Sequence, residues 1–423
     1  MTKTIITKAR RIVRDNQLEP IMVVIEDGKI VAMNSGIIDE EGEVLDAHGA
    51  LVMPGLVDVH THLREPGFEA KETIVTGTKA AAHGGYTTIC AMPTLNPVPD
   101  TPEHLKVEQD IIEKDAVVKV LPYASITQNR MTEDLVELSL LAKSGAFAFS
   151  NDGNGVQTED TMRQAMTEAT KLHKAIVAHA ENKNLMAGGV IREGKFGLPE
   201  WKPETEYEQV ARDLKLAKET GVHYHICHIS TKETVDLVRK AKANGVHVTA
   251  EVAPHHLLLA VKDIPEDNAL YKMNPPLPTQ VDQEALLTGL LDGTIDMIAT
   301  DQAPHTTAEK SGSFREGAFG IVNIEQAFAL LYTKFVQTGI FTLEQLQKWM
   351  STAPVKAFNI TNAGQLHIGD PADLVLFDLK KEFSVDPKDF LSKGTNTPFI
   401  GWELYGETRL TMVDGKIVYR KEL

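Results

Sequence analysis

Apolar runs of strand length alternate with longer stretches of helical character through the middle of the chain. The eight runs cover residues 55–59, 87–92, 117–123, 146–149, 175–178, 223–227, 246–252 and 295–300. Helical stretches lie between them, among them residues 69–83, 159–173, 207–220 and 231–243. Eight alternating strand–helix units predict a parallel (β/α)8 barrel.

Both ends of the chain have a different pattern, with short strands and tight turns. Residues 22–32 have the pattern of a hairpin that turns at Asp27-Gly28, and residues 410–418 contain a second Asp-Gly turn. Residues 372–377 form a further apolar run. We therefore predict an α/β fold, a TIM-type barrel at 53–359 with a small β-sandwich domain that both termini, 1–52 and 360–423, build together.

In barrels of this kind the active site lies where the strands end and the loops to the helices begin. Polar groups able to bind metal or substrate follow six of the eight predicted strands. They are His60 and His62 after the first strand, Thr94 and Asn96 after the second, Asn151 and Asp152 after the fourth, His179 after the fifth, His228 at the end of the sixth, and Asp301 and His305 after the eighth. This convergence predicts one site at that end of the barrel.

The first of these groups is a His-x-His pair, His60 and His62, at the end of an apolar run. Alternate residues of a strand point to the same side, so both imidazoles can reach one metal ion. Asp58 lies on the same face, one step deeper. The alternative interpretation is a pair of histidines in a polar turn.

The candidate metal ligands are four histidines and two carboxylates, namely His60, His62, His179, His228, Asp152 and Asp301. Nitrogen and carboxylate ligands without a thiolate suit zinc, although manganese, iron or cobalt would also fit, and six ligands can hold one or two ions.

Three of these assignments have competing interpretations, and the alternative for His179 is a satisfied polar residue on a barrel loop. His223 and His225 are close to His228 and share a face, and only its position at the strand end favours His228. Asp152 stands before a glycine and is either a turn residue or a second or bridging metal ligand. His255 and His256 are interpreted as packing or supporting residues.

Asp301 is the candidate general base, because a carboxylate beside a metal-activated water can take its proton and return it to a leaving nitrogen. The alternative is a helix N-cap. Arg64 can bind a substrate carboxylate with two hydrogen bonds. Asn96 and Asn274 offer amide hydrogen bonds, and His305 can donate to the same carboxylate.

Residues 306–320 have the composition of a mobile loop over the mouth of the barrel. Within this loop we interpret Lys310 as a solvated residue.

Composition limits the classes of partner. Apolar and charged contents of 42% and 24% are ordinary for a soluble globular protein. A net charge of −16 argues against nonspecific binding to nucleic acid and against docking on anionic membranes. Cys90 and Cys227 lie in apolar runs, and we expect both to be buried thiols. We find no signal peptide and no stretch long enough to span a membrane, and expect a cytoplasmic protein.

The chain resembles dihydroorotases of the amidohydrolase superfamily, in the bacterial class called type I. The segments that carry the resemblance are DVHTHLREPG (58–67), FSNDGNGVQ (149–157), VAHAE (177–181), HICHIST (225–231), VTAEVAPHH (248–256), KMNPP (272–276), TDQAPH (300–305) and NTPF (396–399). The family has a (β/α)8 barrel and a small β-domain built from both termini.

The resemblance also implies roles for individual residues. His60, His62, His179 and His228 fall on metal-ligand positions. Asp152 falls on the aspartate that bridges or neighbours a second metal, and Asp301 on the catalytic aspartate, which is also a ligand. Arg64, Asn96, Asn274 and His305 fall on substrate-contact positions.

The implied activity is the zinc-dependent interconversion of L-dihydroorotate and N-carbamoyl-L-aspartate in pyrimidine (UMP) biosynthesis. A metal-bound hydroxide is the implied nucleophile, with Asp301 as general base and acid. We expect one or two zinc ions per subunit, a homodimer, and an association with aspartate transcarbamoylase as a possible partner interaction.

Two positions depart from many relatives, which carry His at Gln302 and Asp at Asn151. No lysine ends the fourth strand, where hydantoinases and dihydropyrimidinases place a carboxylated, metal-bridging lysine. One alternative function is another cyclic-amide hydrolase such as an allantoinase, which Arg64 with Asn96 argues against because allantoin lacks a carboxylate. The other is a silent homologue that only binds aspartate transcarbamoylase, although none of the matched ligands is lost.

Overall fold

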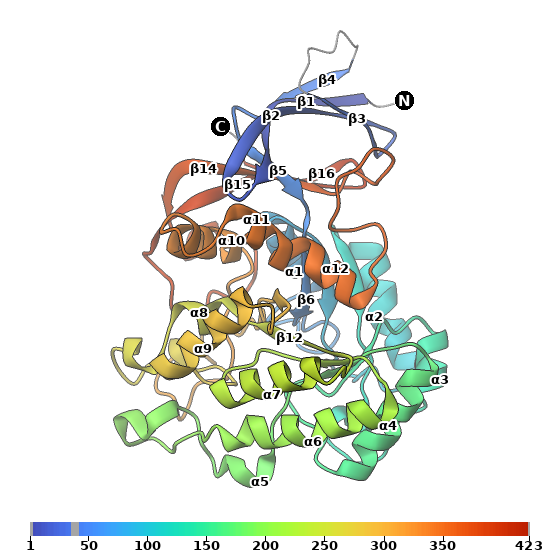
Figure 1. The fold of residues 1–423 in the computed structure, drawn as a ribbon, viewed down its shortest axis with the longest axis vertical. Coiled ribbons are helices and arrows are strands. Elements are labelled where there is room, and N and C mark those ends of the chain that lie inside the picture. Colours follow the sequence, from blue (N-terminus) through green and yellow to red (C-terminus); the bar gives the residue numbers. More distant parts are fainter. Residues whose placement is uncertain (1–2, 35–41, 422–423) are drawn as a thin grey trace.

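Eight parallel strands form the barrel in the computed structural model, which describes residues 3–34 and 42–421 (Figure 1). The strands are β6 (Leu56–Thr61), β7 (Tyr86–Ala91), β8 (Lys119–Pro122), β9 (Phe149–Ser150), β10 (Ile176–Ala178), β11 (Tyr224–Ile226), β12 (Val248–Val252) and β13 (Met297–Ile298). All eight predicted runs are confirmed as strands, although β9 and β13 are shorter than their apolar runs.

The barrel strands pair in sequence order. They form a three-stranded sheet, β6 to β8, and a five-stranded sheet, β9 to β13. Parallel bridges close the two seams between these sheets, Ala124 with Phe149 on one side and Thr61 with Gln302 on the other. The carboxyl ends of all eight strands therefore meet at one end of a closed barrel, where the site was predicted.

Helices surround the barrel and follow its strands. They are α1 (Ile74–His83), α2 (Pro102–Asp115), α3 (Leu138–Lys143), α4 (Glu159–Lys171), α5 (Lys183–Met186), α6 (Glu204–Thr220), α7 (Lys232–Ala243), α8 (Pro254–Leu258), α9 (Gln280–Leu291), α10 (Ala327–Leu331), α11 (Leu343–Gln347) and α12 (Ala353–Phe358). Six of them begin after a threonine whose hydroxyl accepts a backbone N–H of the first turn, which satisfies a donor that the helix leaves unpaired. These threonines are Thr73, Thr101, Thr158, Thr231, Thr279 and Thr342.

The first helix is shorter than predicted, because it begins at Ile74 and not at Glu69. Residues before Thr73 are held outside the helix by the buried carboxylate of Glu72. That carboxylate accepts hydrogen bonds from the Thr73 N–H and from the hydroxyl of Ser392, which lies far along the chain. A tertiary contact thus overrides the local helical tendency.

Strands from both termini form one eight-stranded sheet at the end of the molecule where the two termini lie (Figure 1). They are β1 (Lys3–Arg14), β2 (Gln17–Glu26), β3 (Lys29–Asn34), β4 (Glu43–Asp46), β5 (Leu51–Pro54), β14 (Leu374–Ser384), β15 (Glu403–Val413) and β16 (Lys416–Arg420). The sheet runs in the order β16-β15-β14-β5-β1-β2-β3, with β4 beside β1. The two predicted hairpins are confirmed at β2–β3 and β15–β16.

N-terminal and C-terminal strands share one hydrophobic core, in which Ile6, Val23 and Leu45 pack with Leu374 and Met412. This arrangement makes the small domain a β-sandwich that neither end of the chain could build alone. The exact domain boundaries, near residues 52 and 360, stay a prediction.

Apolar side chains of the strands form a cluster in the interior of the barrel. Alternate residues of the strands fill it, including Val57, Cys90, Tyr123 and Met297, and Phe358 of α12 belongs to the same cluster. Both cysteines are buried free thiols, as expected. Within the described ranges, no helix is long and apolar enough to cross a membrane.

Candidate active site

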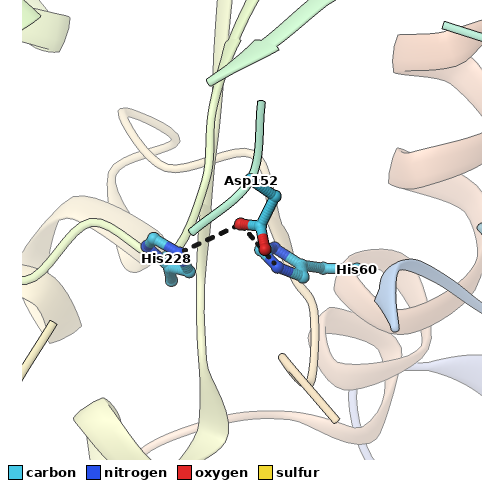
Figure 2. A group of neighbouring side chains, drawn as sticks. All are labelled: His60, Asp152 and His228. Carbon is cyan, nitrogen blue, oxygen red and sulfur yellow. Dashed lines mark ion pairs between the residues drawn. The ribbon is translucent and has the colours of Figure 1, made fainter. Parts of the chain in front are cut away.

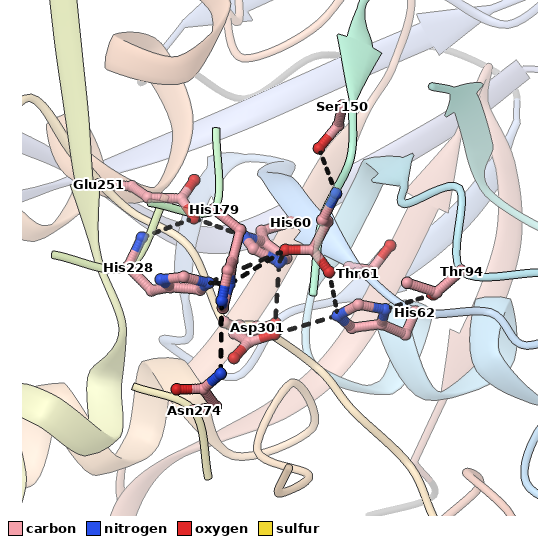
Figure 3. Close-up of polar contacts among 12 residues, drawn as sticks. His60, Thr61, His62, Thr94, Ser150, His179, His228, Glu251, Asn274 and Asp301 are labelled. Carbon is pink, nitrogen blue, oxygen red and sulfur yellow. Dashed lines mark hydrogen bonds and ion pairs between the residues drawn. The ribbon is translucent and has the colours of Figure 1, made fainter. Parts of the chain in front are cut away.

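The strand ends bring the six candidate metal ligands together in one buried cluster (Figures 2 and 3). His60 lies within β6 and His62 just after it, while the others follow strands of the five-stranded sheet. The most exposed of the six, Asp301, has only 7% of its surface exposed. The prediction that the strand ends converge is therefore matched for the five ends that carry these ligands.

Two carboxylates lie between the imidazoles of the His-x-His pair. The Nε2 atom of His60 is 3.3 Å from Asp152 Oδ1 and 3.3 Å from Asp301 Oδ1. The Nε2 atom of His62 is 3.4 Å from Asp152 Oδ2 and 3.2 Å from Asp301 Oδ1. Both Nε2 atoms thus point at the same two carboxylates, which is the arrangement expected when alternate strand residues share a face.

His179 and His228 complete the cluster on the other side of Asp152. Their nearest ring nitrogens, His179 Nδ1 and His228 Nε2, are 3.0 Å apart. They lie 3.8 and 3.9 Å from Asp152 Oδ1. Figure 2 shows Asp152 between His60 and His228, each paired with it by an ion-pair distance. Asp152 therefore contacts all four histidines.

The donor atoms suit a divalent metal. Among the six candidates, two sets of three have their donor atoms close together, His60 with Asp152 and His228, and His60 with His62 and Asp301. The Nε2 atom of His60 and the Oδ1 atom of Asp152 are buried and have no hydrogen-bond partner among the described residues. Buried polar atoms without partners are costly, and a metal ion would satisfy both.

The charges of the cluster reinforce each other. Burial tends to raise the pKa of Asp301, but His60, His62 and His228 together hold it below its usual value. Burial tends to lower the pKa of His60, and the nearby Glu251, Asp301 and Asp152 raise it well above the usual range. Asp301 is consequently a carboxylate at neutral pH, the form that a general base requires.

A second layer of residues orients these side chains, and of these we did not predict the roles of Glu251 and Glu181 from the sequence. Glu251 on β12 accepts from His60 Nδ1 at 2.6 Å and from the backbone N–H of His228 at 3.2 Å. Its signal in the sequence is a single carboxylate within the apolar run 248–252. Thr94 contacts His62 Nδ1 at 2.6 Å, and Glu181 contacts His179 Nε2 at 3.4 Å.

Buried carboxylates also fix the backbone of the segments that carry the cluster residues. Asp58, one step deeper than His60, accepts from the Thr300 N–H at 3.1 Å and so ties β6 to the segment that carries Asp301. Glu206 of α6 accepts from both the N–H and the hydroxyl of Ser230 and of Thr231, two and three residues after His228.

Three residues at the site have left-handed backbones. They are Arg64, His228 and Asp301, with φ values of 63°, 31° and 49°. Side chains other than glycine rarely adopt this conformation, and where they do it is often at functional sites held by surrounding contacts. At His228 the turn ends the strand alternation, so its side chain joins the metal cluster, whereas His223 and His225 point elsewhere.

The four predicted substrate contacts surround the cluster at different distances. Asn274 donates to Glu181 and lies 3.4 Å from His179 Nε2. Arg64 Nε donates to the Pro304 carbonyl at 3.3 Å, and its guanidinium lies 3.4 Å from His305 Nε2. Burial lowers the pKa of Arg64 to about 10, which leaves it cationic at neutral pH. The side chain of Asn96 is exposed.

Two hydrogen bonds hold His305 in place, one from its ring and one from its backbone N–H. Its Nε2–H donates to the Phe319 carbonyl at 2.7 Å, and its backbone N–H donates to Asn396 Oδ1 at 3.0 Å. Burial, with Arg64 and Lys71 nearby, lowers the pKa of His305 to about 3, so the ring is neutral. A cavity of about 650 Å³ lies beside His305 and is lined also by Lys310 and Asn396.

The interpretation of Lys310 as a solvated residue is wrong. Only 4% of its surface is exposed, and its ammonium donates to the backbone carbonyls of Lys272, Ala318 and Gly320 at 2.8–2.9 Å. Burial and the charge of Lys272 lower its pKa to about 7. Lys310 therefore fastens the loop 306–320 to the body of the protein.

The two departures from the family pattern have structural roles. Gln302 Oε1 accepts from the N–H groups of Asn323 and Ile324 at 2.8 and 3.0 Å. Asn151 Oδ1 accepts from the Ile126 N–H at 2.9 Å, and its amide donates to Thr127 Oγ1 at 2.7 Å. Both side chains hold loops in place beside the cluster.

Known proteins are similar to this chain over nearly its whole length. The family model described as Dihydro-orotase-like matches residues 49–234. The dihydroorotase of Ligilactobacillus salivarius is 58% identical over 95% of each chain, and that of Enterococcus faecalis is 54% identical over 99% of each chain. The dihydroorotase of Staphylococcus aureus is 50% identical over 97% of this chain and 98% of its own.

Solved structures of related enzymes share the fold. The L-hydantoinase (dihydropyrimidinase) of Arthrobacter aurescens superposes with a TM-score of 0.90 at 25% identity, over 100% of this chain and 97% of its own. A D-hydantoinase superposes with a TM-score of 0.86 at 24% identity, over 99% of this chain and 95% of its own. With relatives that are more than half identical over nearly its whole length, the chain belongs to the dihydroorotase family.

Proposed function

We propose that the protein is a dihydroorotase, which interconverts L-dihydroorotate and N-carbamoyl-L-aspartate in pyrimidine biosynthesis. The observation that carries this proposal is the combination of a buried histidine–aspartate cluster with the cationic Arg64 in the loop that follows it. The cluster provides hydrolytic chemistry, and the arginine provides recognition of a substrate carboxylate.

We propose zinc as the metal, held by His60, His62, His179, His228, Asp152 and Asp301, as one or two ions. The cluster offers only imidazole nitrogens and carboxylate oxygens, and its unpartnered atoms at His60 and Asp152 support this assignment. When bound, such a metal lowers the pKa of a water molecule and polarises the carbonyl that is attacked.

Asp301 is the proton carrier of the proposed reaction. In the hydrolytic direction it accepts the proton of the water that attacks the ring amide carbonyl. It then donates that proton to the ring nitrogen as the carbon–nitrogen bond breaks, and ring closure follows the reverse path. Its lowered pKa supports the ionised starting state, and its left-handed backbone turns the carboxylate toward the His-x-His pair.

The substrate carboxylate is proposed to bind Arg64, with Asn96, Asn274 and His305 as further contacts. A guanidinium can form two parallel hydrogen bonds to a carboxylate, which fixes the orientation of the ring. His305 donates its Nε2–H to Phe319 in this structure, so contact with the substrate through that atom requires the donor to change partner.

The alternative functions require different residues at the site. The β9 strand ends in Ser150, followed by Asn151 and Asp152, so the position that would carry a metal-bridging lysine in a hydantoinase is not a lysine. Allantoin has no carboxylate for Arg64. A silent binding protein needs no intact cluster of six ligands.

The deciding experiment measures turnover of L-dihydroorotate by purified protein before chelation, after chelation and after zinc is added back. Metal content is assayed on the same samples. We expect activity to disappear with the metal and to return with zinc, and the stoichiometry distinguishes one ion from two. Bound metal without turnover of dihydroorotate, but with turnover of allantoin or a hydantoin, would replace the proposed substrate. Absence of both metal and turnover would favour the silent binding protein.

We further propose a cytoplasmic homodimer, and name aspartate transcarbamoylase as its candidate protein partner. The acidic net charge and the free buried cysteines support the location, and disfavour nucleic acid or an anionic membrane as a partner. Size-exclusion chromatography with light scattering, with and without purified aspartate transcarbamoylase, tests both the dimer and the complex.

A further inference from the structure

A continuous line of five hydrogen-bonded side chains runs from the metal cluster to the opposite end of the barrel. It begins with His60 Nδ1, which lies 2.6 Å from Glu251 Oε1 (Figure 3). The other oxygen, Glu251 Oε2, lies 2.9 Å from His225 Nε2. His225 Nδ1 is 2.8 Å from the hydroxyl of Thr249, which is 2.7 Å from His223 Nε2.

The far end of this line lies at the floor of the barrel, away from the site. The ring of His223 stacks on His247 at 4.6 Å, and Phe358 of α12 lies 5.2 Å from it. Phe358 also packs at 4.9 Å against His225, which is fully buried. A cavity of about 440 Å³ at this floor is lined by His223 and His247.

The donors and acceptors of the line fit one direction. Both oxygens of Glu251 act as acceptors, because Oε1 accepts from the backbone N–H of His228 and also lies against His60 Nδ1, while Oε2 lies against His225 Nε2. His60 Nδ1 and His225 Nε2 must then both carry hydrogen. With its hydrogen on Nε2, the His225 ring can accept at Nδ1 from the Thr249 hydroxyl, and Thr249 in turn accepts from His223 Nε2–H.

The other titratable groups around His223 are compatible with this order of donors and acceptors. His223 faces His225 and His247, and the cavity beside it also contains His173 and Lys174. Burial, followed by the proximity of His225 and His247, lowers the pKa of His223 to about 3. His223 therefore remains a neutral donor across the pH range in which the enzyme would work.

We propose that Thr249 and His223 are positioning residues for the metal site, which act through His225 and Glu251 to fix the tautomer of His60. With hydrogen held on Nδ1, His60 keeps Nε2 free as a metal ligand. This inference rests on the proposed metal role of His60. It assigns a function to polar residues at the floor of the barrel, where strand residues otherwise serve packing alone.

The test compares Thr249→Val, which removes the hydroxyl at nearly constant volume, with Thr249→Ser, which retains it. Thr88→Val is the matched control, since Thr88 lies on a barrel strand and its buried hydroxyl has no partner among the described residues. The zinc dissociation constant is measured by competition with a chelator. The ¹⁵N shifts of labelled histidines report which nitrogen of each ring carries hydrogen.

We expect Thr249→Val to weaken zinc binding about tenfold, the lower end of the loss seen when an outer partner of a metal ligand is removed. The histidine shifts should show a mixture of tautomers in this variant. Thr249→Ser and Thr88→Val should bind zinc as the parent does. His223→Phe, at the half-buried end of the line, should repeat the loss and serves if Thr249→Val does not fold.

Unchanged zinc binding and tautomers in Thr249→Val and His223→Phe would overturn the proposal. An equal loss in Thr249→Ser would also overturn it, because that result would mean that Thr249 acts by packing. Hydrogen on His225 Nδ1 in the parent would also overturn the proposal, because the donor–acceptor order along the line would then be reversed. None of these measurements uses turnover, so failure of the proposed reaction and failure of the positioning line are seen separately.

Discussion

Asp152 and Asp301 lie between the same histidines, yet their surroundings give them different roles. Asp152 contacts all four histidines of the cluster and is 3% exposed, which suits a ligand that bridges. Among the described residues, Asp301 contacts only His60 and His62 at ion-pair distance, and it stands at the start of a loop. These surroundings support its proposed role as the carboxylate that exchanges a proton with substrate.

Replacement of Asp301 by Asn should separate proton transfer from metal binding. Asn keeps the shape and can still offer an oxygen, but it cannot accept a proton. We expect turnover of L-dihydroorotate to fall by about 10²–10⁴-fold, the usual contribution of a general acid–base group. Metal content, measured on the same preparation, should be retained or only weakened. Turnover close to that of the parent would remove Asp301 from this role.

Replacement of Arg64 by Lys tests recognition of the carboxylate. Lysine keeps the positive charge and must adopt the same left-handed backbone as Arg64. It lacks the planar guanidinium that binds two oxygens at once. We expect KM for L-dihydroorotate to rise about 10- to 100-fold, equivalent to one charge-assisted hydrogen bond, with a smaller change in kcat. Arg163→Lys on the exposed side of α4 is the control. An unchanged KM would place the carboxylate elsewhere.

Individual residues also show what sequence patterns can and cannot predict. The candidate ligands could be predicted because each directly follows an apolar strand, and strand ends converge in a barrel. Glu251 was missed because its role depends on a neighbour 191 positions away in the chain, His60. Lys310 was misinterpreted because its partners are backbone carbonyls, which leave no signature in the sequence.

At the scale of elements, strand positions followed from the pattern, but exact ends did not. The apolar runs located all eight barrel strands and both hairpins. The start of α1 depended on Glu72 and its contact with Ser392, which only the folded chain brings together. The short β13 ends before its apolar run does because the residues after it turn toward the site, as at Asp301, whereas β9 is short because it begins three residues later than its run.

Helix α2 contains a buried acid with no visible function. Glu108 is 1% exposed, and neither carboxylate oxygen has a hydrogen-bond partner among the described residues. Burial raises its pKa well above the usual value. The folded state therefore keeps Glu108 protonated at a pH where the unfolded chain, with a pKa of about 4.3, has released that proton.

This difference makes stability fall as pH rises. A raised pKa in the folded state contributes stability at pH values below the unfolded pKa, and that contribution is lost as the pH increases toward the folded pKa. Glu108→Gln does not titrate, so its melting temperature relative to the parent should increase from pH 5 to pH 8. The loss approaches about 1.4 kcal/mol per pH unit within this window. Glu113→Gln, exposed on the same helix, should show no such trend. A difference in Tm between Glu108→Gln and the parent that stays constant from pH 5 to pH 8 would contradict this prediction.

The loop 306–320 is the element whose fastening can be tested directly. Lys310→Met removes the ammonium and leaves three backbone carbonyls without this donor, each a cost of about 1–3 kcal/mol where no water replaces it. We expect chymotrypsin to cut the variant faster at Phe314 and Phe319, as followed by mass spectrometry. Lys215→Met on the exposed face of α6 provides the control. Equal cleavage rates in the two variants would mean that other contacts hold the loop.

At the scale of the whole molecule, the metal cluster lies across a seam of the barrel. His60 and His62 belong to the three-stranded sheet, whereas Asp152, His179, His228 and Asp301 follow strands of the five-stranded sheet. Between β6 and the segment after β13 the two sheets are joined by the bridge of Thr61 with Gln302 and by the contact of Asp58 with Thr300. A metal ion at the cluster would add a direct link between the sheets.

Metal binding should therefore stabilise the entire fold as well as the site. A ligand that binds only the folded state at 100 times its dissociation constant stabilises it by about 2.7 kcal/mol, which amounts to a rise of a few degrees in Tm. We expect chelation to lower Tm and zinc to restore it in the parent. His60→Ala should lose this response, because its Nε2 belongs to both sets of converging donors. His367→Ala, whose side chain is 70% exposed, should keep it. The zinc-dependent rise in the Tm of the parent should also be smaller at pH 5.5, where protons compete with the metal for the histidines. A zinc response that survives in His60→Ala would mean that the metal binds elsewhere.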